Sequence, residues 1–156
     1  MSTTLARLDA FFEDRGERLN TGRATVTFAA QPLNVPPGLH FACADHFVRG
    51  LGYQPIGGNW ELLDAEGDAG APRSARAALV NAFSHDMVFP QEAWLGESGA
   101  QVLAEAFLAC FDPDTVQIVT NRMYFRWNPI TAATIEWAFV AFDSSAIALL
   151  LATAED

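Results

Sequence analysis

The spacing of the apolar residues changes along the chain, and this change restricts the fold more than any other feature. Before position 112, most apolar residues recur at intervals of three or four, as in a helix with one buried face. After position 112, apolar and polar residues mostly alternate, as in a β-strand. Helices therefore precede most strands instead of alternating with them, and this order favours an α+β fold over a parallel α/β fold.

Four helices are predicted from the helical spacing. They cover residues 5–19, 38–51, 74–85 and 98–110. Ser74 and Ser98 are expected to cap the third and fourth helices, because a serine side chain accepts a hydrogen bond from the first helical turn. Pro36 and Pro37 are placed to open the second helix.

Five strands are predicted around this helical half. They cover residues 24–30, 60–62, 115–121, 133–142 and 146–153. The last two are separated only by Asp143-Ser144-Ser145, which predicts a hairpin. The final strand is almost entirely apolar, so we expect it to lie inside the sheet with both faces covered. The expected fold of residues 1–156 is one α+β domain, with about four helices on one face of a mainly antiparallel sheet of four to five strands and a C-terminal β-hairpin.

The charge balance argues against nucleic acid and membranes as partners. The chain has 19 acidic and 9 basic residues, a net charge of −10, and all of its cations are arginines. Binding to nucleic acid or anionic lipid requires clustered cations that neutralise phosphates. The most apolar segment, 134–154, is interrupted by Glu136 and Asp143, so it does not read as a membrane span.

The N-terminal sequence and the two cysteines indicate a cytoplasmic protein. The first 15 residues lack a basic leader followed by an apolar core, so no export signal is expected. Cys43 and Cys110 are then expected to remain reduced thiols. Heavy use of alanine without any lysine is typical of nucleotide bias and favours a bacterial genome. The expected state is a monomer or a homodimer.

The segment HFACADH carries the main candidate for enzyme chemistry. His40, Cys43 and His46 follow one another at steps of three along a predicted helix, and imidazole and thiolate are good zinc ligands. Cys43 and His46 also stand one turn apart, as a nucleophile and its base can, and His85 can add a further group from another helix. The alternative interpretation is structural, because Cys43 lies on the apolar face of its helix. These residues make a small metal- or cysteine-dependent hydrolase the alternative function.

Two other acidic features have weaker functional interpretations. His85 and Asp86 are adjacent, and adjacent residues diverge by about 100° on a helix, so they do not pair naturally as a base and its orienting carboxylate. Asp64, Glu66 and Asp68 alternate in a glycine-rich loop, but the spacing of a calcium-binding loop is absent. We expect a solvated loop there. No phosphate-binding or cofactor motif is present in the sequence, and no cofactor is expected.

The segment 122–128 (RMYFRWN) concentrates cationic and aromatic residues in an acidic chain. If the strand at 115–121 continues through it, Arg122, Tyr124 and Arg126 lie on one face. The intervening apolar residues, Met123, Phe125 and Trp127, then lie on the other face and fill the core. Glu136, on the next strand, offers a carboxylate to Arg122 or Arg126 if the register permits.

Arginine, tyrosine and tryptophan are enriched where binding energy is concentrated in protein interfaces. The preferred interpretation is therefore a small, acidic, non-enzymatic protein-binding module. Its binding residues are Arg122, Tyr124, Arg126, Trp127 and Asn128. The negative charge favours encounter with a basic partner, as in an immunity- or antitoxin-type inhibitor. A third interpretation is a site for an apolar small molecule, because the chain has 12 phenylalanines that can line a cavity.

Overall fold

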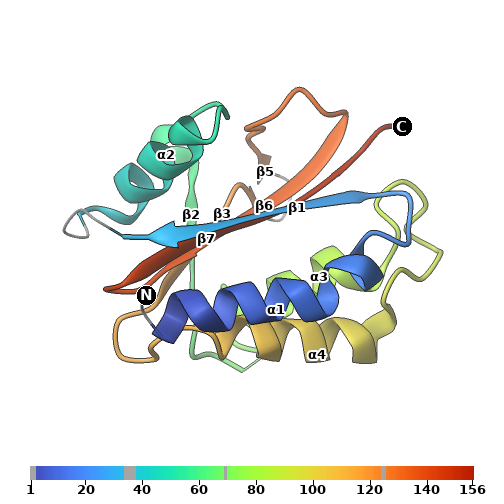
Figure 1. Cartoon of the computed structure of the whole chain (residues 1–156). Helices are drawn as coiled ribbons and strands as arrows, with labels where there is room; N and C mark the ends of the chain where they lie inside the picture. Colours follow the sequence, from blue (N-terminus) through green and yellow to red (C-terminus); the bar gives the residue numbers. More distant parts are fainter. Residues whose placement is uncertain (1–2, 34–37, 69, 124–125) are drawn as a thin grey trace.

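The computed structural model describes residues 3–33, 38–68, 70–123 and 126–156. The helices are α1 (Thr3–Leu19), α2 (His40–Gly50), α3 (Ala75–Ser84) and α4 (Gly96–Leu108), with a short 3-10 turn, η1 (Gly57–Asn59). The strands are β1 (Thr25–Pro32), β2 (Glu61–Leu63), β3 (Gln117–Thr120), β4 (Arg122–Met123), β5 (Arg126–Trp127), β6 (Ile135–Phe142) and β7 (Ala146–Ala154). Figure 1 shows their arrangement.

The main sheet has five antiparallel strands in the order β1-β7-β6-β3-β2, and β4 and β5 form a separate two-stranded sheet. Strands β6 and β7 pair along their length, from Ile135 opposite Ala154 to Phe142 opposite Ile147. The α+β fold and the C-terminal hairpin are therefore confirmed. The interior position expected for the last strand is also confirmed, because β7 lies between β1 and β6.

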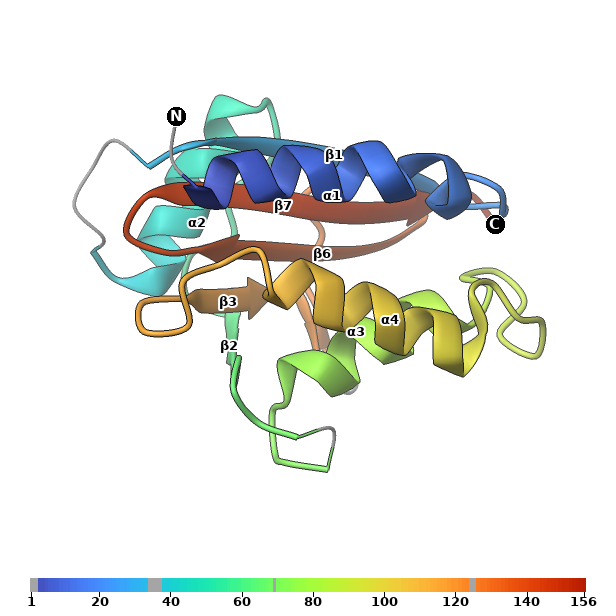
Figure 2. The same cartoon turned by 60° about the horizontal axis from the view of Figure 1, so that its bottom comes forward.

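Helices cover both faces of the main sheet. Helices α1, α3 and α4 lie on one face and α2 lies on the other (Figures 1 and 2). The expectation that all helices share one face is wrong for α2, and β6 and β7 explain why. Their residues are apolar on both sides: Phe139 and Leu150 belong to the core beneath α1, α3 and α4, whereas Val140 and Leu149 belong to the core beneath α2. A sheet that is apolar on both faces needs a covering layer on each.

The helix starts agree with the sequence in one case and differ in another. The Ser74 side chain accepts a hydrogen bond from the Ala77 N–H at 3.2 Å, so the cap of α3 is confirmed. The cap predicted at Ser98 is wrong: α4 begins at Gly96, and its capping residue Leu95 makes no side-chain cap. The backbone of Leu95 instead donates to the Phe83 carbonyl at 3.1 Å, which ties the start of α4 to the end of α3. Pro36 and Pro37 lie outside the described residues.

Asp143, in the β6–β7 turn, joins the N-terminal helix to the sheet. Its buried carboxylate accepts hydrogen bonds from the Thr4 hydroxyl (2.7 Å) and from the N–H groups of Asp112 (3.0 Å), Ser145 (2.9 Å) and Ala146 (3.0 Å). Burial alone would raise the pKa of the Asp143 carboxyl, but these hydrogen bonds outweigh it and lower the pKa below its usual value. Asp143 is therefore an ionised structural group.

Candidate functional site

The segment 122–128 does not continue β3. Strand β3 ends at Thr120, and Asn121 follows as a fully buried residue whose side chain takes the place of ladder hydrogen bonds. Its Oδ1 accepts from the Ala138 N–H at 2.8 Å, and its Nδ2 donates to the Asn128 carbonyl at 3.1 Å. The backbone N–H of Asn128 donates in turn to the Asn121 carbonyl at 2.9 Å. Asn121 and Asn128 thus close the base of the β4–β5 hairpin.

Glu136 is fully buried and extends this network to the segment after the hairpin. Its Oε2 accepts from Asn121 Nδ2 at 2.8 Å and from the Ile130 N–H at 2.9 Å. Its Oε1 accepts from the N–H (2.9 Å) and the hydroxyl (2.7 Å) of Thr131. The pairing expected between Glu136 and Arg122 or Arg126 is therefore wrong, because the carboxylate faces the α2 side of β6 and is already filled by four donors.

The hairpin places two of the candidate binding residues in solvent. Arg122 pairs with Trp127 and Met123 pairs with Arg126, and directly opposite residues of an antiparallel pair share a face. Arg122 and Arg126 therefore lie on opposite faces of the hairpin. The expectation that both arginines share one face of a continuous strand is wrong. The Arg126 side chain is 81% exposed, and Trp127 is 39% exposed instead of filling the core. Tyr124 lies outside the described residues, and Asn128 is half-buried at the hairpin base.

A charged cluster connects the hairpin to the edge strand β2. The Arg126 guanidinium lies 3.8 Å from the Glu61 carboxylate, and the same carboxylate accepts from Arg73 at 2.7 Å. Arg73 also donates to the Leu62 carbonyl at 2.9 Å and has a left-handed backbone, with φ of 59°, which is uncommon for a residue with a side chain. The Arg126 side chain is largely in solvent, and its distance from Glu61 is longer than that of a hydrogen bond. Its donors therefore remain available to a binding partner.

Arg122 is turned away from Arg126 and lies on an aromatic platform. Its guanidinium carbon is 4.7 Å from the centroid of the Trp137 ring, an arrangement typical of a cation–π contact. The indole N–H of Trp137 donates to Thr120 Oγ1 at 2.9 Å, and its ring stacks on Phe139 at 5.9 Å, so the platform is fixed on β6. Within the described residues, the Arg122 guanidinium makes no hydrogen bond and no ion pair.

A pocket of about 640 Å³ adjoins this platform, between α3, the loop before it and the start of β4. Its lining includes the charged or polar residues Arg73, His85 and Arg122 and the apolar residues Met87, Met123 and Trp137. Arg122 is half-buried there, and this burial lowers the pKa of its guanidinium, although arginine remains charged at any physiological pH. No motif in the sequence predicts this pocket, because α3 and β6 are distant in the chain.

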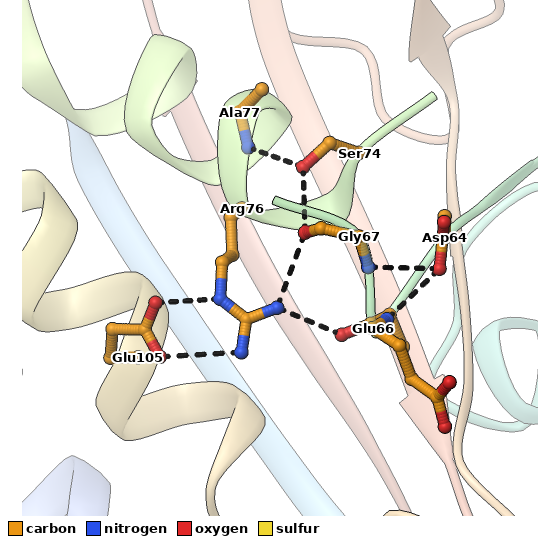
Figure 3. A network of polar contacts seen from close by, with 8 residues as sticks. Asp64, Glu66, Gly67, Ser74, Arg76, Ala77 and Glu105 are labelled. Atoms are coloured by element: carbon orange, nitrogen blue, oxygen red, sulfur yellow. Dashed lines mark hydrogen bonds and ion pairs between the residues drawn. The ribbon is translucent and has the colours of Figure 1, made fainter. Parts of the chain in front are cut away.

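The loop that forms one wall of the pocket is anchored to two helices, as Figure 3 shows. Arg76 donates to the Gly67 carbonyl at 3.3 Å and to Glu105 on α4 at 2.6 Å. Asp64 accepts from the Gly67 N–H at 3.0 Å. Asp64, one of the acids that alternate in this loop, therefore binds the loop's own backbone, and Arg76 holds the loop against α3 and α4.

The residues considered for enzyme chemistry lie in different surroundings. Cys43 is buried against the sheet beneath α2, and burial raises the pKa of its thiol, which disfavours the reactive thiolate. His46 is exposed, and the ring of His40 contacts Phe41 at 5.7 Å. His85 is the capping residue at the end of α3, on the other side of the sheet. In the part of the chain that the structure describes, no three His, Cys, Asp or Glu residues form a group that could hold a metal ion.

The carboxylates next to these histidines have structural partners. Asp45 accepts from the N–H groups of Ile56 (2.9 Å) and Gly57 (2.8 Å) and from the Trp60 indole (2.8 Å), and so fixes the chain after α2.

Asp86 is likewise held by its own loop. It accepts from the N–H groups of Phe89 and Val88, each at 2.9 Å, and pairs with Arg23 at 3.1 Å. The hydrogen bond from Phe89, together with those from Val88 and Arg23, lowers the pKa of the Asp86 carboxyl below its usual value. None of the described hydrogen bonds joins Asp86 to His85.

No described helix combines the length and the apolar character needed to cross a bilayer. Comparison of the chain with protein-family models, with curated proteins and with solved structures gave no significant match.

Proposed function

We propose that the protein is a small binding module that recognises another protein through the β4–β5 hairpin. The observation that carries this proposal is the exposure of Arg126 and Trp127 on a hairpin whose base is fixed by buried hydrogen bonds. Arginine and tryptophan combine a large contact area with directional donors, and they are enriched among the residues that dominate interface energies.

The hydrogen-bonded base of the hairpin also favours binding. Binding costs less conformational entropy when the contact residues are already held in place. Asn121 and Glu136 tie both ends of the hairpin to β6, so partner binding does not have to order that backbone. A fixed, exposed arginine–tryptophan pair is better suited to docking than the same pair on an unsupported loop.

The charge of the chain indicates the class of partner. A net charge of −10 attracts a basic protein over distances of about a Debye length, whereas Arg126 acts only at contact. At contact, its donors fit carboxylate or backbone carbonyl oxygens of the partner. An immunity- or antitoxin-type inhibitor of a basic protein is the concrete form of this proposal, and an acidic chain of this kind does not suit nucleic acid.

The test is retention of a partner by variants of the hairpin. A tagged copy captures partners from its native cell extract, and the affinity of each purified partner is then measured by calorimetry. Arg126→Ala and Trp127→Ala are each expected to weaken binding by about 1–4 kcal/mol, because truncation of an interface anchor has that effect. Arg49→Ala is the matched control, since Arg49 is an exposed arginine in the last turn of α2 and does not belong to the hairpin.

The fold of each variant is checked by circular dichroism before affinities are compared. A partner that binds both hairpin variants as tightly as it binds the wild type would contradict the proposal. Equal weakening by Arg49→Ala would show that total charge, and not the hairpin, determines binding.

A further inference from the structure

The pocket beside Arg122 has the size and wall chemistry of a small-molecule site. Its volume of about 640 Å³ lies within the range of roughly 300–1,000 Å³ usual for such sites. Met87, Met123, Trp137, Ala82 and Pro90 contribute apolar surface to its lining. These walls suit a ligand with an apolar body.

The charged groups of the lining differ in what they already bind. Arg73 is bound to the Leu62 carbonyl and to Glu61. Asp86 is bound to Arg23 and to the backbone of its own loop. Arg122 alone among these three has no acceptor within the described residues. One positive charge in the lining is therefore uncompensated.

The position of Arg122 prepares it for a planar anion. Its guanidinium carbon lies over the Trp137 ring, 4.7 Å from the centroid, and a cation–π contact of this kind occupies no hydrogen-bond donor of the group. The side chains of Asn81 and His85 also line the pocket and make no hydrogen bond within the described part of the chain, so they can supply further polar contacts. A guanidinium edge matches the two oxygens of one carboxylate.

We propose that this pocket binds a small organic acid, with its carboxylate on Arg122 and its apolar body against Trp137 and the neighbouring methionines. A monoanion fits better than a phosphate. The lining offers only one uncompensated cation, and the negative charge of Asp86 in the same lining opposes a dianion. This site goes beyond the hairpin contact proposed above and does not use Arg126 or Trp127.

The test uses 3-phenylpropionate as a probe, because it combines one carboxylate with an apolar body. Calorimetry on the wild-type chain is expected to give saturable binding with Kd below about 1 mM. The neutral analogue 3-phenylpropionamide is expected to bind at least about tenfold more weakly, because it lacks the charge that Arg122 would pair with. Inorganic phosphate is the competing anion and is expected not to displace the probe.

Variants locate the binding. Arg122→Gln is expected to weaken probe binding by at least about tenfold, since it removes the charged fork. Arg49→Gln removes a charge outside the pocket and is expected to leave the affinity unchanged. Ala77→Leu fills the pocket from α3 without changing charge, and it is expected to abolish binding. This variant also keeps the test decisive if Arg122→Gln fails to fold.

Three results would overturn the assignment of this pocket: no saturable binding of the acid, equal binding of acid and amide, or full affinity in folded Arg122→Gln or Ala77→Leu. If phosphate displaces the probe at phosphate concentrations below the Kd of the probe, the choice of a carboxylate ligand is overturned. Because these variants leave Arg126 and Trp127 unchanged, failure here does not affect the hairpin proposal, and failure of the hairpin proposal does not affect this one.

Discussion

At the scale of single residues, buried polar side chains shape the candidate site. Asn121 and Glu136 are both fully buried, and their described side-chain hydrogen bonds are to each other, to the hairpin base, to the segment after the hairpin and to β6. Buried groups of this kind are stabilising only while their partners are complete. The hairpin therefore depends on two residues that have no contact with solvent.

Replacing Glu136 tests this dependence. In the wild type, one carboxylate oxygen of Glu136 accepts from Asn121 and Ile130, and the other accepts from Thr131. In Glu136→Gln, an NH2 group replaces one of these oxygens and faces donors that then have no acceptor. We expect a loss of about 1–3 kcal/mol in the free energy of unfolding, measured by urea denaturation, because buried donors are left unsatisfied. Glu97→Gln, at an exposed position, is the control. A loss no larger than that of the control would contradict the role assigned to Glu136.

At the scale of elements, the ends of helices and strands could be predicted where apolar residues repeat regularly, and could not be predicted where the backbone is irregular. Helix α1 and strands β6 and β7 lie within two residues of their predicted ends, because their apolar positions repeat over many residues. The prediction was wrong at Asn121, where a side chain replaces ladder hydrogen bonds and ends β3. The prediction was also wrong for the start of α4. A backbone hydrogen bond to the end of α3 fixes this start, and no serine cap is present there.

The candidate site was only partly predictable for the same reason. The composition of segment 122–128 marked it as unusual, but which side chains reach solvent depends on the pairing of β4 with β5. The pocket is lined by residues of α3 together with Trp137 of β6, and the spacing of residues in the sequence does not predict that these distant segments lie on one pocket. Asp143 was predicted to lie in the hairpin turn between the last two strands, but its hydrogen bond with Thr4 of α1 depends on tertiary packing that sequence spacing does not reveal.

Asp143 gives a prediction of pH dependence for the junction between α1 and the sheet. Its folded-state pKa is lowered, so its contribution to stability is complete above the unfolded-state pKa of about 3.9 and is lost as pH falls through the folded-state pKa. In urea denaturation, Asp143→Asn is expected to be less stable than the wild type by about 1–3 kcal/mol at pH 7. The difference is expected to shrink below about pH 4. A difference that is constant from pH 7 to pH 3 would contradict this assignment.

At the scale of the whole molecule, the arginines are distributed unevenly. The chain carries a net charge of −10, yet Arg73 and Arg122 line one pocket, and Arg126 shares Glu61 with Arg73. Three of the nine cations thus belong to the hairpin or line the pocket beside it. Under the hairpin proposal, the overall field would attract a basic partner at long range, and this local group of arginines would supply donors at contact.

The most direct test of the hairpin proposal is amide hydrogen exchange of the chain with and without a captured partner. If the hairpin is the contact surface, peptides that cover residues 121–131 exchange more slowly when the partner is bound, and the exchange of α2 is unchanged. Protection confined to α2 or to the exposed face of α1, with residues 121–131 exchanging at the same rate in both states, would contradict the hairpin proposal.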